Sequence, residues 1–419
     1  MVRLLVIADD FTGALDTGVQ FKAKNSCVLL YKAGKENLRE ILNRDIQVLI
    51  IDTESRHLCA KEAYQIIYDI IKTALELGIQ YIYKKTDSGM RGNIGSELSA
   101  FWMASGKSRI HFIPAFPQMG RTTVNGIHYI DHVPVAESVF GNDPFEPVKS
   151  SAVRDIIAEQ SDVPVIEKKE QDVSDEGNGI YVYDSATKEE MVTLGRKLKK
   201  EQELHFLAGC AGFASILLLE LLDLELIKDE VPCFDKHLLI VCGSINSVTV
   251  EQLDCAAENG MKRIVLSPFQ KLSENWISSD EGKTCLHKWK DEIMSGDAII
   301  ECGVHDLKET TRCAKNMNLE LAESRKRIAD SMGGILAELL NEGIESTLLV
   351  TGGDTLLAFM EHIELDTLVP TCEITPGVVL SKLEYGNRTF NLLSKSGGFG
   401  TRDLFVTLSK LIKKECVEI

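Results

Sequence analysis

The sequence contains no run of about 18 apolar residues, which is the length that a helix needs to cross a lipid bilayer. The apolar stretch at its start, residues 2–8, is too short for a secretory signal peptide, and no small-residue cleavage site follows it. We therefore expect a cytoplasmic protein without a membrane partner.

Cysteines at metal-binding spacing are also absent. The 11 cysteines are an odd number, they are scattered, and none forms a C-x-x-C pair. Cys27 and Cys242 lie inside apolar runs. This pattern indicates reduced thiols, and it gives no support to a disulfide framework or a zinc site.

Basic side chains are few. The chain has 46 Lys and Arg against 63 Asp and Glu, a formal net charge of −17. The densest basic cluster, residues 196–200, alternates with apolar residues and is typical of a solvated helix face. We expect no nucleic-acid partner, because such a protein usually needs a basic face. If the substrates are anions, positive charge must be gathered locally.

Standard fingerprints are missing as well. No G-x-G-x-x-G follows a strand-like run, which leaves a dinucleotide fold without direct support. The GKT at residues 282–284 has no strand before it, so we predict a surface loop there. The signatures of metalloproteases and α/β-hydrolases, H-E-x-x-H and G-x-S-x-G, do not occur.

What the sequence does contain is a repeated pattern of a short apolar run, a polar cluster and a helix-like stretch. Such runs lie at residues 2–8, 47–51, 81–83 and 110–113, and the pattern starts again at His237. Apolar runs that alternate with helices indicate parallel sheets covered on both faces. We therefore predict an α/β protein with two three-layer domains, mainly parallel sheets, and an active site in the cleft between the domains. The predicted domains are residues 1–230 and 237–419.

Charged side chains follow the apolar runs of the first domain. Because ligands bind at the carboxyl ends of parallel strands, four such clusters together favour a site, although each acid alone could be a helix cap. The acids could orient a polyhydroxylated substrate or accept a proton: Asp9, Asp10 and Asp87. The cations could hold a carboxylate, and arginine could do so with two parallel bonds: Arg56, Lys85, Arg91 and Arg121.

Three glycine-rich turns follow strand-like runs in the second domain. Such turns let backbone N–H groups approach phosphate oxygens at the start of a helix, although α/β proteins also use glycine for tight turns. Three in one domain favour nucleotide binding. They are Gly243–Ser244, Gly352–Gly353–Asp354–Thr355 and Gly397–Gly398–Phe399–Gly400.

Together these motifs resemble the four-carbon acid sugar kinase family. The matching stretches run through nearly the whole chain and include IADDFTGALDTG, KKTDSGMRGNIGSEL, CGSINSVT, VTGGDT, ITPGV and SKSGGFG. The resemblance implies a sugar-acid-binding domain followed by a nucleotide-binding domain. It also implies that ATP phosphorylates the terminal hydroxyl of threonate, erythronate or 3-oxotetronate. The family's nucleotide contacts would fall on Ser244, the Gly352–Thr355 turn and the Gly397–Gly400 turn.

For the reaction we expect ATP with Mg²⁺, a substrate carboxylate on Arg91 and Arg121, and Asp87 as proton acceptor, with Asp10 second. Gly89 and Met90 stand where family members often have Thr-Leu, beside the predicted substrate site. Which acid is the substrate, which aspartate is the base and which residues bind metal stay open. A homo-oligomer is possible. A nicotinamide-dependent oxidoreductase of hydroxy acids and a non-catalytic sensor of sugar acid or nucleotide are the alternatives.

Overall fold

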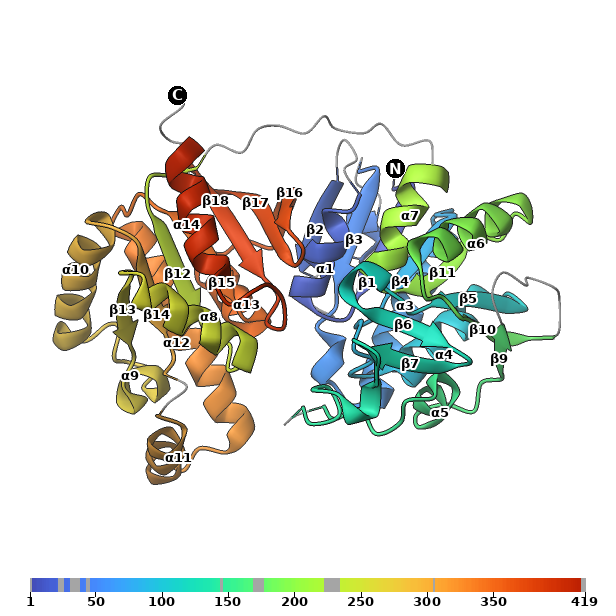
Figure 1. Ribbon diagram of the computed structural model, residues 1–419, viewed down its shortest axis with the longest axis horizontal. Coiled ribbons are helices and arrows are strands. Elements are labelled where there is room, and N and C mark those ends of the chain that lie inside the picture. Colours follow the sequence, from blue (N-terminus) through green and yellow to red (C-terminus); the bar gives the residue numbers. More distant parts are fainter. Residues whose placement is uncertain are drawn as a thin grey trace. The chain divides into compact units, whose positions relative to one another are not determined.

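A computed structural model describes residues 2–21, 26–30, 38–42, 46–143, 146–168, 177–221, 234–303 and 306–415. The chain divides into two compact units, Met1–Lys228 and Asp229–Ile419, each with its own sheet (Figure 1). In the segment 231–236, between the two predicted domains, residues 231–233 lie outside the described residues.

The first unit is built on a parallel sheet of eight strands in the order β2-β3-β1-β4-β11-β5-β10-β9. Apolar residues fill most strand positions, as expected for a sheet that is covered on both faces. The strands are β1 (Leu4–Ala8), β2 (Ser26–Leu30), β3 (Val48–Asp52), β4 (Tyr81–Lys85), β5 (Arg109–Ile113), β9 (Val165–Lys168), β10 (Gly179–Tyr183) and β11 (Phe206–Gly209).

Helices cover both faces of this sheet. The neighbouring helices α2 (Leu38–Leu42), α3 (Ala60–Glu76), α4 (Ile94–Ser105) and α5 (Val153–Ala158) pack in succession. A second group contains α1 (Phe11–Gly18), α6 (Lys188–Lys200) and α7 (Ala211–Leu221). The main core lies between the sheet and the α3–α4 pair, where Ile67, Ile71 and Phe101 are fully buried.

A small antiparallel sheet follows β5 in the first unit. It consists of β6 (Arg121–Val124), β7 (Ile127–Ile130) and β8 (Val133–Pro134). The β6–β7 turn uses Asn125 and Gly126, both with positive φ, which suits the tight hairpin between the two strands. Short 3-10 segments, η1 (Ser55–His57), η2 (Pro117–Met119) and η3 (Val135–Glu137), lie in the loops.

The second unit has a seven-stranded sheet in the order β13-β14-β12-β15-β18-β17-β16. Its first five strands are parallel, and β17 and β16 extend it antiparallel. The strands are β12 (Leu238–Cys242), β13 (Lys262–Val265), β14 (Ala298–Glu301), β15 (Thr347–Thr351), β16 (Thr367–Thr375), β17 (Val378–Tyr385) and β18 (Arg388–Lys395).

The helices of the second unit also form two groups. One contains α8 (Ser247–Glu258) and α14 (Leu404–Glu415), whose apolar side chains Leu253, Phe405 and Leu408 join the core with β12 and β18. The other is centred on α12 (Leu321–Asn341), with α9 (Pro268–Leu272), α10 (Asp280–Met294) and α13 (Gly353–His362) against it, while α11 (Leu307–Asn316) packs on α9.

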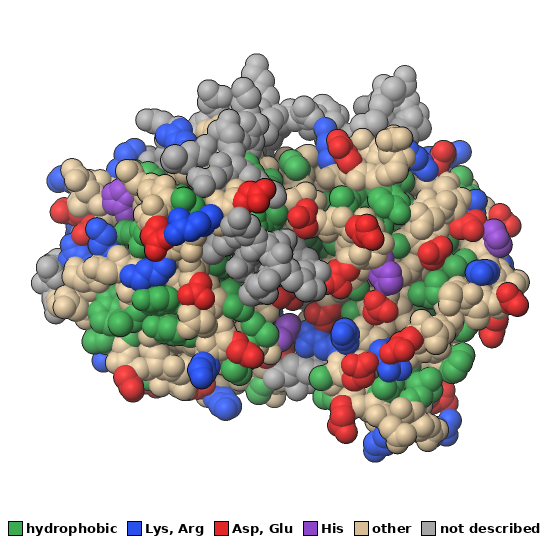
Figure 2. Space-filling model, turned by 180° about the vertical axis from the view of Figure 1, so that it is seen from behind, with side chains coloured by type: hydrophobic (Ala, Val, Ile, Leu, Met, Phe, Trp, Pro, Cys, Tyr) green, Lys and Arg blue, Asp and Glu red, His purple; other side chains and the backbone are tan. Residues whose placement is uncertain are grey.

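The prediction of two three-layer α/β folds with mainly parallel sheets is confirmed. The prediction of a loop at residues 282–284 is wrong, because Ser279 caps α10 and these residues lie in its first two turns. Within the described residues, no helix is long and apolar enough to cross a membrane. Figure 2 shows acidic and basic side chains interspersed over the face that it presents.

Candidate active site

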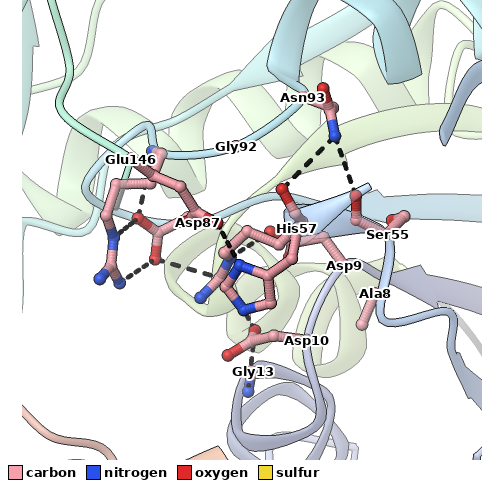
Figure 3. A network of polar contacts seen from close by, with 12 residues as sticks. Ala8, Asp9, Asp10, Gly13, Ser55, His57, Asp87, Gly92, Asn93 and Glu146 are labelled. Carbon is pink, nitrogen blue, oxygen red and sulfur yellow. Dashed lines mark hydrogen bonds and ion pairs between the residues drawn. The ribbon is translucent and has the colours of Figure 1, made fainter. Parts of the chain in front are cut away.

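The predicted site of the first unit lies at one edge of its sheet. Strands β3, β1 and β4 are neighbours, so the loops that follow their carboxyl ends meet there. These loops carry Asp9 and Asp10, Arg56, and Asp87 to Arg91. Figure 3 shows the polar network that joins them. The structure therefore brings together six of the seven residues predicted for this site: Asp9, Asp10, Arg56, Lys85, Asp87 and Arg91.

Arg56 is the centre of this network. Its Nε donates to Asp9 Oδ2 at 2.8 Å, and its Nη2 lies 2.7 Å from Asp10 Oδ1 and 3.7 Å from Asp87 Oδ1. The Arg56 side chain is only 8% exposed. Burial acts to lower the pKa of Arg56, but the carboxylates of Asp10, Asp9 and Asp87 outweigh it and raise that pKa well above its ordinary value. A permanent cation thus ties the ends of three strands together.

Asp87 is bound on both carboxylate oxygens. Arg91 donates from Nε to Oδ2 at 2.8 Å and from Nη2 to Oδ1 at 3.1 Å, and the amides of Gly89 and Arg91 donate to Oδ2 at 3.2 Å each. Burial would raise the pKa of Asp87, but Arg91 and Arg56 hold it far below its ordinary value. Arg91 also donates from Nη1 to Asp143 Oδ2 at 3.2 Å.

Lys85 joins the network more loosely, with its Nζ 4.0 Å from Asp9 Oδ1. Beneath it, the neighbouring Lys84 forms a fully buried ion pair, 2.8 Å from Nζ to Glu97 Oε2. Ser55 donates a short hydrogen bond to the other oxygen of Glu97, and Lys84 Nζ donates to Lys85 O at 2.6 Å. This buried layer fixes the backbone of β4 where it enters the site.

Arg121, the seventh predicted residue, lies at the start of β6 and reaches the cluster through an aromatic ring. The centre of the Phe140 ring lies 5.0 Å from Cζ of Arg91 and 5.9 Å from Cζ of Arg121. A Cβ on Gly89 would lie 2.7 Å from atoms of this ring, so the absence of a side chain at position 89 makes room for Phe140. Burial lowers the pKa of Arg121.

Several residues of this site were missed by sequence reasoning. Asp143 and Phe140 lie in a loop without a motif, and Glu97 lies inside α4, where it reads as an ordinary helix acid. Asp52, at the end of β3, is completely buried, and burial raises its pKa to about 8. The only indication of Asp52 in the sequence is its place at the end of an apolar run, and many other residues have a similar place.

In the second unit the three glycine turns meet at the carboxyl ends of β12, β15 and β18, of which β15 pairs with both of the others. A Cβ on Gly352 would lie 3.3 Å from Ser244 N, and one on Gly397 would lie 3.3 Å from Ser244 Oγ. Gly352 has a φ of +110°, a conformation that other residues rarely adopt. Ser244 therefore lies against both of the other predicted turns.

The other residues predicted to bind the nucleotide differ in what they contact. Asp354 is engaged by Arg325, with Nε 2.6 Å from Oδ2 and Nη2 3.2 Å from Oδ1. Thr355 is buried against Gly243. Gly353, the first residue of α13, and the pair Gly398 and Gly400 complete the set that the structure gathers at this edge.

The described residues contain no group of three or more His, Cys, Asp or Glu side chains that could hold a metal ion. The acids of the first unit's site are instead engaged by arginine. Mg²⁺ usually keeps several waters and binds through substrate phosphates with one or two carboxylates. The described residues thus offer no dedicated cage for the metal.

Two protein-family models match the chain in succession. One describes a sugar-binding N-terminal domain and matches residues 4–217. The other describes a nucleotide-binding C-terminal domain and matches residues 239–405. Together with the charged sheet edge and the glycine turns, they define a kinase of small molecules. The chain belongs to the four-carbon acid sugar kinase family, as its motifs predict.

Curated relatives span the whole chain. A D-threonate kinase of Salmonella typhimurium is 29% identical, with 96% of each chain covered. A D-erythronate kinase of Heliobacterium modesticaldum is 25% identical over 97% of this chain and 96% of its own length. A 3-oxo-tetronate kinase of Pseudomonas fluorescens is 22% identical over 95% and 94%. The kinase prediction is thereby favoured over both alternatives, the oxidoreductase and the sensor.

Two solved structures share the fold. One from Salmonella typhimurium has a TM-score of 0.75 at 19% identity and covers 97% of this chain and 98% of its own. One from Haemophilus influenzae has a TM-score of 0.68 at 19% identity, with 97% and 100% covered. At these identities the likeness concerns the fold alone.

Proposed function

We propose that the protein uses ATP to phosphorylate the terminal hydroxyl of a four-carbon sugar acid, namely threonate, erythronate or 3-oxotetronate. The observation that carries this proposal is the gathering of Arg56, Lys85 and Arg91 at one sheet edge, in the unit that matches a sugar-binding domain. Because the protein has a net charge of −17, it must gather basic side chains locally in order to bind an anion.

The substrate carboxylate binds to Arg91, with Arg121 beside it. Arg91 is 26% exposed, and three of its five N–H groups are used by Asp87 and Asp143. The two N–H groups that are left, one on each terminal nitrogen, can donate to a carboxylate. Asp143 already occupies this side of Arg91, so a substrate carboxylate would bind next to Asp143 or replace it.

The proton acceptor is Asp10 rather than Asp87, which reverses the order expected from the sequence. Asp87 receives two bonds from the Arg91 side chain and two from backbone amides, and its low pKa makes it a weak base. Asp10 receives one bond from Arg56, one from Thr12 Oγ1 at 2.8 Å and one from Gly13 N at 3.2 Å. We assign to Asp87 the task of positioning Arg91.

ATP binds in the second unit at Ser244 and the two turns Gly352–Thr355 and Gly397–Gly400. Phosphoryl transfer needs positioning and charge neutralisation more than covalent help from the protein. Mg²⁺ would arrive with the ATP phosphates, and we assign it no protein ligand. That the reaction takes place in the cleft between the domains and in the cytoplasm stays a prediction, and so does a homo-oligomer.

A coupled assay of ADP release tests the proposal. Each of the three acids is supplied with ATP and Mg²⁺, and erythritol, which has the hydroxyls but no carboxylate, is the matched control. We expect acid-dependent ADP release and no turnover of erythritol. ADP release at the same rate with and without acid would contradict the proposal. So would acid-dependent reduction of NAD in a mixture without ATP and coupling enzymes.

A further inference from the structure

A completely buried lysine lies directly under one of the glycine turns of the second unit. Lys395 is the last residue of β18, and its side chain is 0% exposed. Its Nζ donates to Ser396 O at 3.0 Å, to Gly397 O at 3.1 Å and to Thr249 Oγ1 at 3.2 Å. All three N–H groups of the ammonium are therefore used inside the protein.

Two side chains of α8 hold the same turn. Thr249 Oγ1 donates to Gly397 O at 2.8 Å. Gln252 Nε2 donates to Phe399 O at 2.9 Å and to Thr401 O at 3.0 Å. Both side chains are completely buried. With Lys395, they fix four carbonyl groups of the segment 396–401 toward the interior.

The carbonyl groups determine where the amides point. In a planar trans peptide the C=O and the N–H of the next residue point in opposite directions. Inward carbonyls on Ser396, Gly397 and Phe399 therefore turn the amides of Gly397, Gly398 and Gly400 away from the interior. Within the described part of the chain, these same three amides donate to no acceptor. Three amides that face away from the interior on one turn are what an anion-binding loop requires.

The charge of Lys395 has no counter-charge among the residues that the structure describes. No carboxylate lies within ion-pair distance of it among the described residues, and the titratable group that faces it is the thiol of Cys242 on β12. Burial raises the pKa of Cys242, so that thiol is neutral. The ring of Phe405 on α14 also faces the ammonium, 6.0 Å from Nζ to the ring centre. A buried cation without a counter-charge is costly, and an anion bound to the turn above it would reduce that cost.

We propose that Lys395, together with Thr249 and Gln252, orients the amides of Gly397, Gly398 and Gly400 as a phosphate-binding turn and supplies the turn with positive charge. Lys395 is a positioning residue, because its three donors are used by the protein. This inference rests on the proposed binding of ATP in the second unit. It adds three residues that the glycine motif alone does not contain.

The test compares Lys395→Met with Lys271→Met. Lys271 is a matched control, since it is also a buried lysine of the second unit that donates to backbone carbonyls, Cys302 O at 2.5 Å and Gly303 O at 3.4 Å. We expect Lys395→Met to raise the KM for ATP and the Kd for ATP in calorimetry at least tenfold, with the KM for the acid unchanged. Lys271→Met should leave both ATP constants within twofold of wild type.

A pH profile of the wild-type protein is the second measurement, and it does not depend on the folding of a variant. Burial lowers the pKa of Lys395 to about 8. The ammonium is present below that pKa and lost above it, so ATP affinity should fall from pH 7.5 to 9.5. Lys395→Met should bind ATP weakly, with an affinity that does not change over this pH range. Thr249→Val should also bind ATP more weakly than wild type, but its affinity should still fall as the pH rises.

Two outcomes would overturn the inference: a folded Lys395→Met variant with wild-type ATP affinity, or a wild-type affinity that is constant from pH 7.5 to 9.5. They differ from a failure of the proposed function, in which the wild-type protein itself would neither bind ATP nor release ADP with any of the acids.

Discussion

Arg91 holds Asp87 by two parallel hydrogen bonds, Nε to Oδ2 at 2.8 Å and Nη2 to Oδ1 at 3.1 Å. Paired bonds of this kind fix the plane of the guanidinium as well as its position. The site thus contains an arginine that is already oriented before substrate arrives. The proposed division of labour, in which Asp87 positions Arg91 and Asp10 accepts the proton, follows from this pair and gives opposite expectations for the two aspartates.

For Asp87→Asn we expect the KM for the sugar acid to rise about tenfold, because the neutral amide cannot hold Arg91 with two charge-assisted bonds, each worth about 1.5–3 kcal/mol. The turnover number should change only a few-fold. Steady-state kinetics with the acid varied at saturating ATP measure both constants. A fall in turnover of a hundredfold with an unchanged KM would return Asp87 to the role of base.

For Asp10→Asn we expect the reverse. Asparagine caps a helix as well as aspartate does, so α1 should keep its N-terminus, but the amide cannot accept a proton. Loss of a general base typically reduces turnover about a hundredfold to ten-thousandfold. The same assay, with a thermal melt to confirm folding, decides the matter. Turnover within threefold of wild type would exclude Asp10 as the base.

Gly89→Ala tests the place of Phe140. The new Cβ would lie 2.7 Å from the ring atoms, so the ring must move away from Arg91 and Arg121. We expect the KM for the acid to rise several-fold, since each contact between a guanidinium and a ring is worth about 0.5–2 kcal/mol. The KM for ATP should not change.

Two further variants make this test specific. Gly296→Ala is the matched control, because a Cβ there meets nothing within 4 Å, and it should behave as wild type. If the effect passes through the ring, Gly89→Ala should add nothing to Phe140→Ala in the double variant. Fully additive effects on KM would show that Gly89 acts in another way.

Gly398→Val tests the phosphate-binding turn without disturbing the fold. A Cβ at this position has Asn246 Nδ2 as its nearest neighbour, at 3.9 Å, and the φ of Gly398 is not positive. The protein should therefore fold, but a branched side chain would stand in front of the free amides. We expect at least a tenfold loss of ATP affinity in calorimetry with normal binding of the acid. Normal ATP affinity in a folded variant would remove this turn from the nucleotide site.

The ion pair of Lys84 with Glu97 should be a determinant of stability. Both side chains are at most 1% exposed, and removal of one partner leaves a buried charge alone, at a typical cost of about 3–5 kcal/mol. Lys84→Met should lower the free energy of unfolding in urea by that amount, and Lys84→Met with Glu97→Leu should recover part of it. Arg402→Ala, which breaks an exposed pair with Glu258, should cost less than about 1 kcal/mol. Equal costs for the buried and the exposed pair would refute this reading.

The sequence predicted the parallel sheets and most of the site because both depend on local patterns. Buried strands such as β1 and β4 are short apolar runs, and the polar residues that follow them, Asp9 and Asp87 among them, are adjacent to those runs in the sequence. Parallel pairing then brings the loops together without any further information.

The residues that escaped prediction depend on tertiary contacts. Lys395 lies inside the matching stretch SKSGGFG, but nothing in that stretch indicates its role, and Gln252, 143 positions earlier, lies outside all the matching stretches. Phe140 comes from an irregular loop, and its place is set by the missing side chain of Gly89, 51 positions earlier. The strands β16 and β17, which extend the second sheet antiparallel, were not predicted, because their alternation of apolar and polar residues is weak.

The central claim is that phosphate passes from ATP to the terminal oxygen of a four-carbon acid, and phosphorus NMR of the reaction mixture tests it most directly. An ester on a terminal CH₂–OH couples to two protons and gives a triplet. With threonate, erythronate or 3-oxotetronate we predict a new triplet that grows as the ADP resonances appear and that is absent with erythritol. Inorganic phosphate as the only new signal, or a doublet from an ester on a secondary hydroxyl, would contradict the account.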